Sequence, residues 1–216
     1  MRGDCFIYGA GEIVAPYYKP KNGDLVIAAD AGYDYLLQSG IKADLAVGDF
    51  DSLGHTPTSG VETEVHPVMK DDTDTELAVK KGFEKGFSRF FIYGGTGGRL
   101  DHTLANIQVL SYIAQNGGMG FLFGEDYTIT AVICGTLEFC AEYRGTVSVF
   151  ALCGKAAGVN LTGLKYPLEE ATLTGYDPIG VSNEFTGSSS QIEVKDGCIA
   201  VIWQKNRECE LPKLVL

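Results

Sequence analysis

The sequence predicts two domains: an N-terminal α/β domain with a mostly parallel sheet and helices on both faces, and a C-terminal all-β sandwich. Two patterns indicate this division. Short apolar runs alternate with amphipathic ones in the first half of the 216 residues, as in strands and helices that alternate along a parallel sheet. From about Tyr127 helical periodicity stops, and short runs rich in Val, Ile, Thr and Phe recur between glycine-bearing turns, as in a sandwich. We therefore expect domains at 1–126 and 127–216.

Strands and helices are expected to alternate along the first domain. The apolar runs predict strands at 5–8, 25–29, 45–47, 61–66 and 90–93. Helices are expected at 13–18, at 33–38 before Gly40, and from the capping residues at 72–74 to Gly86. A long helix should follow, ended by a glycine pair and with four apolar residues on one face: Leu104, Ile107, Leu110 and Ile113.

The second domain is expected to contain short strands only. The runs lie at 127–134, 136–140, 146–152, 157–161, 191–195 and 198–203. Asp196 and Gly197 stand between the last two runs, and this dipeptide predicts a β-hairpin there. Trp203 is expected in the core of this domain.

Two carboxylates end the third predicted strand. Asp49 and Asp51 are two residues apart in an extended segment, so their side chains should point to the same side. Like charges held this close need a cation to stay ionised, and Lys70 is the only Lys or Arg among the acids between positions 44 and 76. A hard divalent ion with oxygen ligands is expected, typically Mg²⁺ carried in with a phosphate substrate. The alternative for these two residues alone is a turn of solvated Asp side chains.

Charged residues also follow the other predicted strands. Asp30 follows the second, Asp74 and two neighbouring acids follow the fourth, and Arg99 and Asp101 follow the fifth. Because ligands bind at the carboxyl ends of the strands in such sheets, we expect these side chains to meet at one edge. The segment from Gly94 to Arg99 leaves a strand, contains four glycines and enters a helix, which favours phosphate binding by backbone N–H groups and the Arg fork.

Composition and missing motifs narrow the function further. The net charge of −11 argues against binding to nucleic acid or to an anionic membrane. Six cysteines without a CxxC pair, and no signal peptide or long apolar span, favour a reduced, cytoplasmic, soluble protein. Gly9 and Gly11 lack the third glycine of a dinucleotide loop, since Val14 stands there, and no P-loop is present. His102 beside Asp101 is either a general base or structural.

Several motifs together resemble one family. They are Asp30–Gly32, Gly48–Ser52, Asp71–Asp74, Gly94–His102, Leu161–Leu168 and Gly180–Glu184. In this order they resemble bacterial thiamine pyrophosphokinase over nearly the whole chain; Ala31 departs from a second glycine common there. The resemblance implies an ATP-binding catalytic domain, a thiamine-binding β-sandwich, and a homodimer with sites between subunits. It also implies transfer of the pyrophosphoryl group of ATP to the thiamine hydroxyl, giving thiamine diphosphate and AMP.

The hypothesis assigns a role to each candidate residue. Asp49, Asp51 and Asp74 are expected to hold Mg²⁺ against the ATP phosphates, with Asp101 as a further ligand or orienting group, and either Asp74 or Asp101 as the base. Arg99 is expected to act in catalysis and to bind phosphate. The further expected ATP contacts are Asp30, Thr73, Gly95, Thr96, Gly97 and Gly98. The resemblance places thiamine contacts near Ser182 and Asn183.

Other functions fit parts of the pattern. A different DxD enzyme, such as a metal-dependent phosphoryl or nucleotide-sugar transferase, would also use Asp49 and Asp51. An Asp-nucleophile phosphatase expects Thr or Val where Leu53 stands. A metal-binding regulatory module is the non-enzymatic alternative, but the D-x-D-x-D-G loop of a calcium hand is missing.

Overall fold

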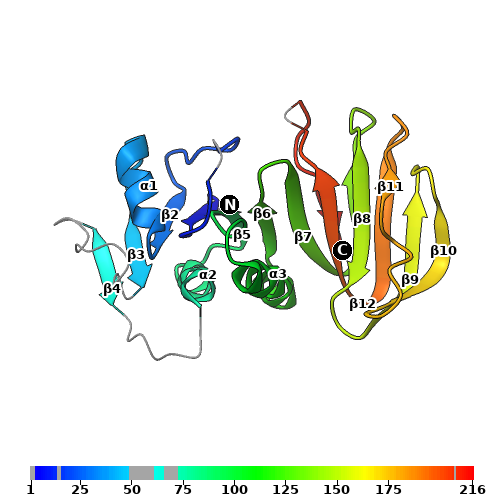
Figure 1. Ribbon diagram of the computed structural model, residues 1–216, viewed down its shortest axis with the longest axis horizontal. Coiled ribbons are helices and arrows are strands. Elements are labelled where there is room, and N and C mark those ends of the chain that lie inside the picture. Colours follow the sequence, from blue (N-terminus) through cyan, green and yellow to red (C-terminus); the bar gives the residue numbers. More distant parts are fainter. Residues whose placement is uncertain (1–2, 14–15, 49–60, 66–72, 207) are drawn as a thin grey trace. The chain divides into compact units, whose positions relative to one another are not determined.

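The chain forms two compact units, Met1–Glu125 and Asp126–Leu216. The computed structural model describes residues 3–13, 16–48, 61–65, 73–206 and 208–216 (Figure 1). No helix in these ranges is long and apolar enough to cross a membrane.

The first unit contains a parallel sheet. Its strands are β1 (Cys5–Tyr8), β2 (Leu25–Ala29), β3 (Leu45–Gly48), β4 (Glu62–Val65), β5 (Arg89–Tyr93) and β6 (Met119–Phe123). Their spatial order is β6-β5-β1-β2-β3-β4, and every neighbouring pair is parallel. Strands β1, β2 and β3 are buried at every residue, which is why their sequences are apolar throughout instead of alternating.

Three helices connect these strands in the described ranges: α1 (Gly32–Ser39), α2 (Asp74–Glu84) and α3 (Leu100–Gln115). Gly40 ends α1 in a left-handed conformation, φ 65°, and its N–H reaches the carbonyls of Leu36 and Leu37, as a C-terminal cap does. Helices α2 and α3 contact each other, and Figure 1 shows α1 apart from both.

Two helix predictions were inaccurate. Of the segment 13–18, the described residues 13 and 16–18 are not helical. On α3, the buried side contains Asn106, Val109, Leu110 and Ile113, whereas Leu104 is 57% exposed. Leu110 and Ile113 of the predicted face are therefore buried as expected, whereas the expected burial of Leu104, near the start of the helix, is wrong.

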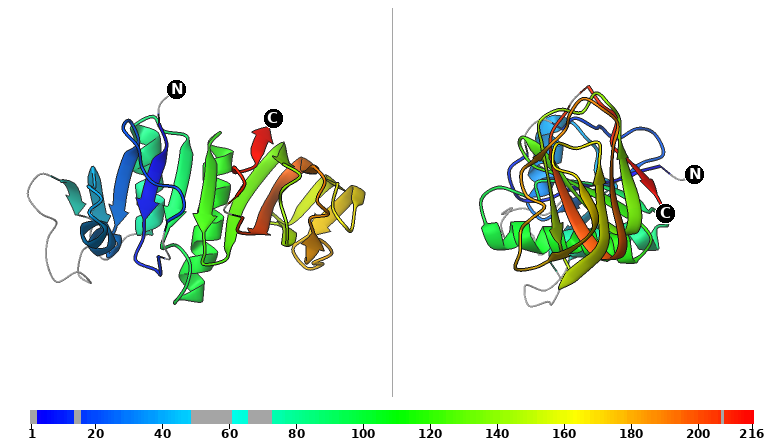
Figure 2. Two further views of the ribbon diagram at one scale, coloured as in Figure 1. Left: turned by 90° about the horizontal axis from the view of Figure 1, so that it is seen from above. Right: turned by 90° about the vertical axis from the view of Figure 1, so that its right-hand side faces the viewer.

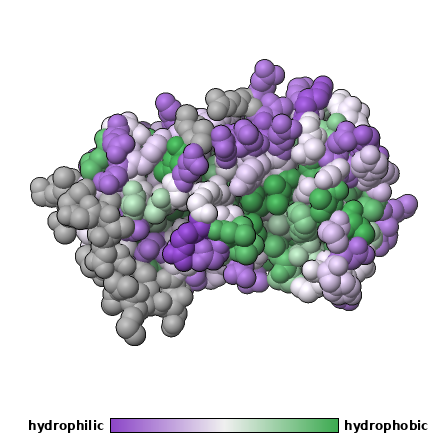
Figure 3. All heavy atoms as spheres, viewed as in Figure 1, coloured by the Kyte–Doolittle hydropathy of each residue, from purple (hydrophilic) through white to green (hydrophobic). Residues whose placement is uncertain are grey.

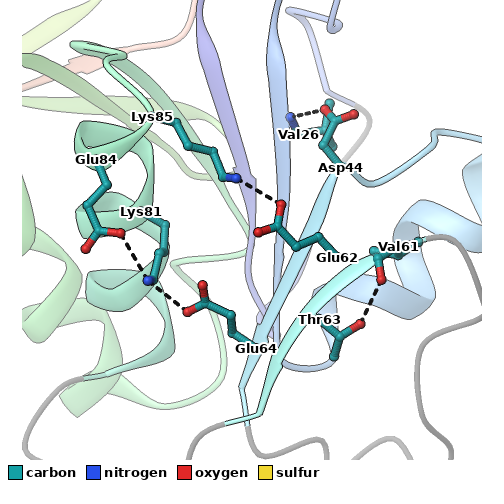
Figure 4. A network of polar contacts seen from close by, with 9 residues as sticks. All are labelled: Val26, Asp44, Val61, Glu62, Thr63, Glu64, Lys81, Glu84 and Lys85. Carbon is teal, nitrogen blue, oxygen red and sulfur yellow. Dashed lines mark hydrogen bonds and ion pairs between the residues drawn. The ribbon is translucent and has the colours of Figure 1, made fainter.

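Ion pairs join the edge strand β4 to helix α2 (Figure 4). Lys81 Nζ lies 2.9 Å from Glu64 of the strand and 3.0 Å from Glu84 of its own helix. Lys85 Nζ lies 2.9 Å from Glu62. Because these groups are partly exposed, each pair contributes little to stability. Together, the pairs from Lys81 and Lys85 connect strand β4 to helix α2.

The second unit consists of antiparallel strands in its described residues. They are β7 (Tyr127–Phe139), β8 (Thr146–Ala151), β9 (Lys155–Thr162), β10 (Leu168–Thr174), β11 (Asn183–Glu184), β12 (Ser190–Gln204) and β13 (Lys213–Val215). Strand β12 pairs with β7 along one edge. Along its other edge, its first half pairs with β9 and its second half with β8. Figure 2 shows these long strands from two further directions.

The hairpin predicted at Asp196 and Gly197 is wrong. Both predicted strands belong to β12, which continues through an irregularity between Val194 and Cys198 where Gly197 has φ 98°. The dipeptide therefore supports a bulge within one strand, a role in which glycine also tolerates positive φ. The runs at 127–134 and 136–140 likewise form the single strand β7.

Aromatic residues fill the core of the second unit. Trp203 is 2% exposed, as expected from the sequence. Its ring lies 5.5 Å from that of Phe139, which in turn contacts Tyr143 and Phe185 at 5.0 and 5.1 Å. Edge-on and tilted contacts of this kind add to the free energy gained from burial.

Candidate active site in the first unit

The strand order changes direction between β1 and β5. From β1 the chain adds β2, β3 and β4 on one side, then returns to place β5 and β6 on the other. At such a switch point the loops after the two central strands separate and leave a crevice at their carboxyl ends. Here those loops are Gly9–Glu12 after β1 and Gly94–Arg99 after β5.

Backbone hydrogen bonds hold these two loops together. The N–H of Gly9 donates to Tyr93 O and that of Gly11 to Gly94 O, each over 2.8 Å. A Cβ on Gly9 would lie 2.8 Å from Gly94 O, and one on Gly94, at φ 67°, would lie 2.4 Å from Gly9 O. Only glycine permits this approach. The glycines that failed as a dinucleotide motif therefore serve to join two loops.

A cavity of about 610 Å³ opens beside these loops, within the size range of small-molecule sites. Residues from five segments form its wall. They are Gly9, Ala10, Gly11, Glu12, Ala29, Asp30, Thr73, Asp74, Thr75, Gly94, Gly95, Gly97, Gly98, Arg99, His102 and Asn106. Of the expected ATP contacts, Thr96 is not in this wall and is only 4% exposed.

Asp30 occupies a strained position at the end of β2. Its φ is 49°, in the left-handed region, where Asp is tolerated better than most residues but still at a cost. Its N–H donates to Val47 O over 2.9 Å. A Cβ at Gly48 would stand 3.2 Å from the Asp30 Cα. Close packing of β2 against β3 thus turns the chain so that Asp30 lines the cavity.

Thr73 and Asp74 reach the cavity from the start of α2. Thr73 is the N-cap, and its hydroxyl accepts the N–H of Glu76 over 3.2 Å. The T-x-x-E spacing is that of a capping box. Asp74 occupies the first turn, where the helix dipole stabilises a carboxylate. The same local signals that begin the helix therefore position both residues at the cavity.

Arg99 and Asp101 form a two-point ion pair at the start of α3. The Arg99 Nη2 lies 2.6 Å from Asp101 Oδ2, and its Nε lies 3.2 Å from Oδ1. The hydrogen bond from Arg99 lowers the pKa of Asp101, and the same bond raises the pKa of Arg99. Arg99 lines the cavity and Asp101 does not. Asp101 is thus placed to orient the guanidinium.

Asn106 is a residue of the cavity that the sequence reasoning did not identify. It lies on the second turn of α3, is 5% exposed, and its Nδ2 donates to Gly95 O over 2.8 Å. The bond fixes the middle of the glycine loop to the helix that follows it. A buried Asn among apolar helix positions was the available signal, because buried polar groups are nearly always hydrogen-bonded.

Several predicted acids fall outside the described residues. Asp49 and Asp51 do, and so do Asp71 and Asp72. Within the described ranges, no group of three acidic, His or Cys side chains could hold a metal ion. The three described acids in the wall, Glu12, Asp30 and Asp74, offer the oxygen donors that suit Mg²⁺, so the donor chemistry fits this ion while the described residues supply only part of a ligand set.

The predicted thiamine contacts lie in the second unit. Asn183 is 3% exposed, and its side chain bonds the backbone of Tyr166 twice: Oδ1 accepts from the N–H over 2.9 Å and Nδ2 donates to the carbonyl over 2.6 Å. Ser182 is exposed, with φ 58°, and its N–H donates to Ser148 Oγ over 3.0 Å. Asn183 therefore holds the segment that presents Tyr166, which is 55% exposed.

Comparison with known proteins identifies two family models along the chain. The catalytic domain of thiamin pyrophosphokinase matches residues 19–120, and the vitamin B1 binding domain of thiamin pyrophosphokinase matches residues 136–199. A thiamine pyrophosphokinase of Bacillus subtilis is 30% identical over 184 residues, which cover 82% of this chain and 86% of that protein.

Solved structures are similar over almost the full length. The crystal structure of thiamine pyrophosphokinase from Bacillus subtilis superimposes with a TM-score of 0.82 at 27% identity, covering 94% of this chain and 100% of that one. The crystal structure of thiamin pyrophosphokinase from Geobacillus thermodenitrificans gives a TM-score of 0.80 at 26% identity, with coverage of 96% and 100%.

Proposed function

The chain belongs to the thiamine pyrophosphokinase family and is a thiamine diphosphokinase, and from this premise we propose that the cavity at the switch point of the first unit binds the phosphates of ATP. The reaction transfers the pyrophosphoryl group of ATP to the hydroxyl of thiamine and yields thiamine diphosphate and AMP. Family membership favours this reaction over the other DxD transferases, the phosphatase and the regulatory module that the sequence left open.

One observation carries the assignment of the cavity. The loops after the two strands that flank the switch point line it together with Asp30 and Asp74; they are Gly9–Glu12 and, except for Thr96, Gly94–Arg99. The glycines of the second loop, Gly94–Arg99, put no side chains in front of their backbone N–H groups, and α3 begins directly after this loop. Backbone donors, a helix N-terminus and a guanidinium together favour a polyphosphate.

The proposed metal ligands are Asp49, Asp51 and Asp74. Mg²⁺, when bound, would offset the negative charge of the phosphates and of the group in transfer. The contribution of the chain is to hold carboxylate oxygens at one edge of the sheet, Asp74 from the first turn of α2 and the other two from the segment after β3. The position of Asp74 in the cavity wall supports this set.

The remaining catalytic roles are assigned to Arg99, Asp101 and Asp74. Arg99 binds phosphate oxygens, and Asp101 holds its guanidinium in the two-point geometry described above. Either Asp74 or Asp101 is proposed to accept the thiamine hydroxyl proton; the pairing with Arg99 lowers the pKa of Asp101 and makes it a weaker proton acceptor while the ion pair is formed. Asp30, Thr73, Gly95, Thr96, Gly97 and Gly98 are proposed to contact or shape the nucleotide site. Most of the catalysis is then positioning and electrostatic stabilisation.

The second unit is proposed to bind thiamine near Ser182 and Asn183. The family model that matches it, a vitamin B1 binding domain, supports this role. Its exposed large apolar side chains, among them Tyr166, Tyr176 and Ile179, suit an aromatic substrate or a second copy of the chain. Figure 3 also shows residues of high hydropathy gathered on one face of this unit. A homodimer with sites between subunits, and a cytoplasmic location, complete the proposal.

We also propose an α/β domain at 1–126 with helices on both faces of its sheet, and a β-sandwich domain at 127–216. Right-handed crossovers put α1 on one face of the parallel sheet, and α2 and α3 on the other. In the second domain, β12 contributes to both layers of a sandwich, because its irregularity between Val194 and Cys198 lets its halves pair with different strands, as at sandwich corners.

Product analysis tests the role of the acids. Purified protein with ATP, Mg²⁺ and thiamine should yield AMP and thiamine diphosphate in equal amounts by chromatography. Replacing Asp49, Asp51 or Asp74 by Asn should lower turnover at least about 100-fold, because a ligand charge is lost where charge develops in the transition state. The circular dichroism spectrum should not change.

Asp196→Asn is the matched control, since Asp196 is an exposed acid on β12 outside the proposed site. It should keep normal turnover. Normal turnover in the Asp49, Asp51 and Asp74 variants would contradict the metal site, and ADP with a monophosphate ester as products would contradict the transfer itself.

A further inference from the structure

A second cavity lies entirely within the second unit, beside the end of β7 and the C-terminal segment. Its volume is about 540 Å³. Two cysteines, Cys140 and Cys209, are in its wall, together with Glu142 and Ser190. Ser190 is 1% exposed, and its hydroxyl has no hydrogen-bond partner among the described residues. Neither cysteine has a role in the proposed reaction.

The segments that contain the two cysteines are joined on both sides of the pair. On one side, Asn206 Nδ2 donates to Glu142 O over 3.1 Å. On the other, Tyr143 Oη donates to Glu210 O over 2.7 Å, and Lys213 of β13 stands opposite Glu138 of β7. These bonds hold the backbone around Cys209 beside the backbone around Cys140, which is what a disulfide requires of its two Cα atoms.

The two thiols line the same cavity and differ in exposure. Cys140 lies within interaction range of the Cys209 thiol and of the Glu142 carboxylate. Cys140 is exposed, whereas Cys209 is 5% exposed. Burial, with the hydrogen bond to Cys140 as a second cause, raises the pKa of Cys209 to about 11. Cys140 is therefore the sulfur that an outside reagent meets first.

We propose that Cys140 and Cys209 are a reversible disulfide-forming pair, oxidised by small-molecule disulfides of the glutathione class that reach them through this cavity. The Cys140 sulfur attacks the small disulfide, forms a mixed disulfide and releases one thiol. The Cys209 sulfur then attacks the Cys140 sulfur and releases the second thiol. The two protein thiols lose their protons and two electrons, and one small disulfide is reduced to two thiols.

The structure favours a cross-link over a metal site at this pair. Within the part of the chain that is described, no three His, Cys or acidic side chains are grouped so that they could hold a metal ion, here or elsewhere. The unpartnered hydroxyl of Ser190 offers a hydrogen bond to a polar molecule in the cavity. Once formed, the bond would tie the C-terminal segment with β13 to β7. Reversibility fits a chain whose cysteines are reduced by default in the cytosol.

Redox titration of the full-length protein tests the proposal. The protein is equilibrated with graded ratios of oxidised to reduced glutathione, quenched in acid, alkylated, digested without reductant and analysed by mass spectrometry. We expect one intramolecular link between the peptides of Cys140 and Cys209, two hydrogen masses lighter than the separate peptides. Both cysteines should lose their alkylation as the link forms, and dithiothreitol should restore it.

Three variants locate the bond. Cys140→Ser and Cys209→Ser should each abolish the intramolecular link, whereas Cys153→Ser should retain it, since Cys153 is another exposed cysteine of the same unit. Links between other pairs, or a glutathione adduct that persists on Cys140 while Cys209 stays alkylatable, would overturn the proposal. Where a variant fails to fold, mass spectrometry of the cross-linked peptides from the unsubstituted protein still tests the proposal.

Discussion

Asn106 is a single side chain on which the shape of the glycine loop depends. Its amide is buried and donates to Gly95 O, so Asn106→Ala leaves that carbonyl without its partner and frees the loop to shift. A displacement of about 1 Å in a positioned group can reduce a rate about 100-fold. We therefore expect kcat of Asn106→Ala to fall about 10- to 100-fold, measured as AMP formation at saturating substrates.

Asn116→Ala is the control for this prediction. Asn116 caps the same helix at its other end, and its Nδ2 donates to Tyr112 O over 2.8 Å, a bond of the same kind away from the cavity. This variant should lose about 0.5–1 kcal/mol of stability and keep its kcat. Equal loss of kcat in both variants would mean that Asn106 acts through the stability of α3 and does not position the loop.

The N-terminus of α2 shows how one element serves both fold and site. The Thr73 hydroxyl accepts the N–H of Glu76, and removal of such a cap costs about 1 kcal/mol. We expect Thr73→Ala to lower the free energy of unfolding of the first unit by about this amount in urea titrations, and Thr73→Ser to restore most of it. A Thr73→Ser variant as unstable as Thr73→Ala would assign the effect to the methyl group instead of the hydroxyl.

Strand β12 shows how tertiary pairing overrides a turn signal. Asp196 and Gly197 favour a hairpin locally, but a continuous strand lets β12 pair with β7 on one side and with β9 and β8 on the other. The backbone hydrogen bonds that a continuous strand makes with three neighbouring strands outweigh those of a two-residue turn. Gly197, at φ 98°, therefore lies in a bulge of the strand and not in a hairpin turn.

Two buried tyrosines and a buried cysteine make the stability of the first unit depend on pH. Burial raises the pKa of Tyr8, Tyr93 and Cys5. In the folded state these three groups stay protonated at pH values where the unfolded chain loses the same protons. Their contribution to the free energy of unfolding is therefore complete below about pH 9 and is lost as the pH rises further. Each group adds a slope of up to about 1.4 kcal/mol per pH unit above its ordinary pKa. We expect stability to fall steeply above pH 10.

Tyr8→Phe and Tyr93→Phe separate this titration from packing. The Tyr8 hydroxyl is buried and has no hydrogen-bond partner among the described residues, whereas the Tyr93 hydroxyl bonds the backbone of Tyr18 twice, over 3.1 Å. Tyr8→Phe should reduce the alkaline slope at no cost near pH 7, because a buried unpaired hydroxyl is removed. Tyr93→Phe should reduce the slope but lose stability at pH 7. Unchanged slopes in urea titrations at pH 8–11 would refute the explanation.

The order of apolar and amphipathic runs was sufficient to predict a parallel α/β domain followed by an all-β one. It also predicted that Asp30, Asp74 and Arg99 would share one edge, because carboxyl ends of parallel strands lie on the same side of a sheet, and in the structure all three line one cavity. Local sequence signals were enough to predict that Thr73 caps the start of α2 and that α1 ends at Gly40.

Contacts between residues distant in the chain established the rest. That β5 lies beside β1, and hence that Gly9–Glu12 faces Gly94–Arg99, depends on long-range strand pairing, which no local pattern encodes. The bond from Asn106 to Gly95 and the proximity of Cys140 to Cys209 arise in the same way. Propensity and spacing act over a few residues, whereas the neighbours of a strand are selected by the packing of the whole sheet.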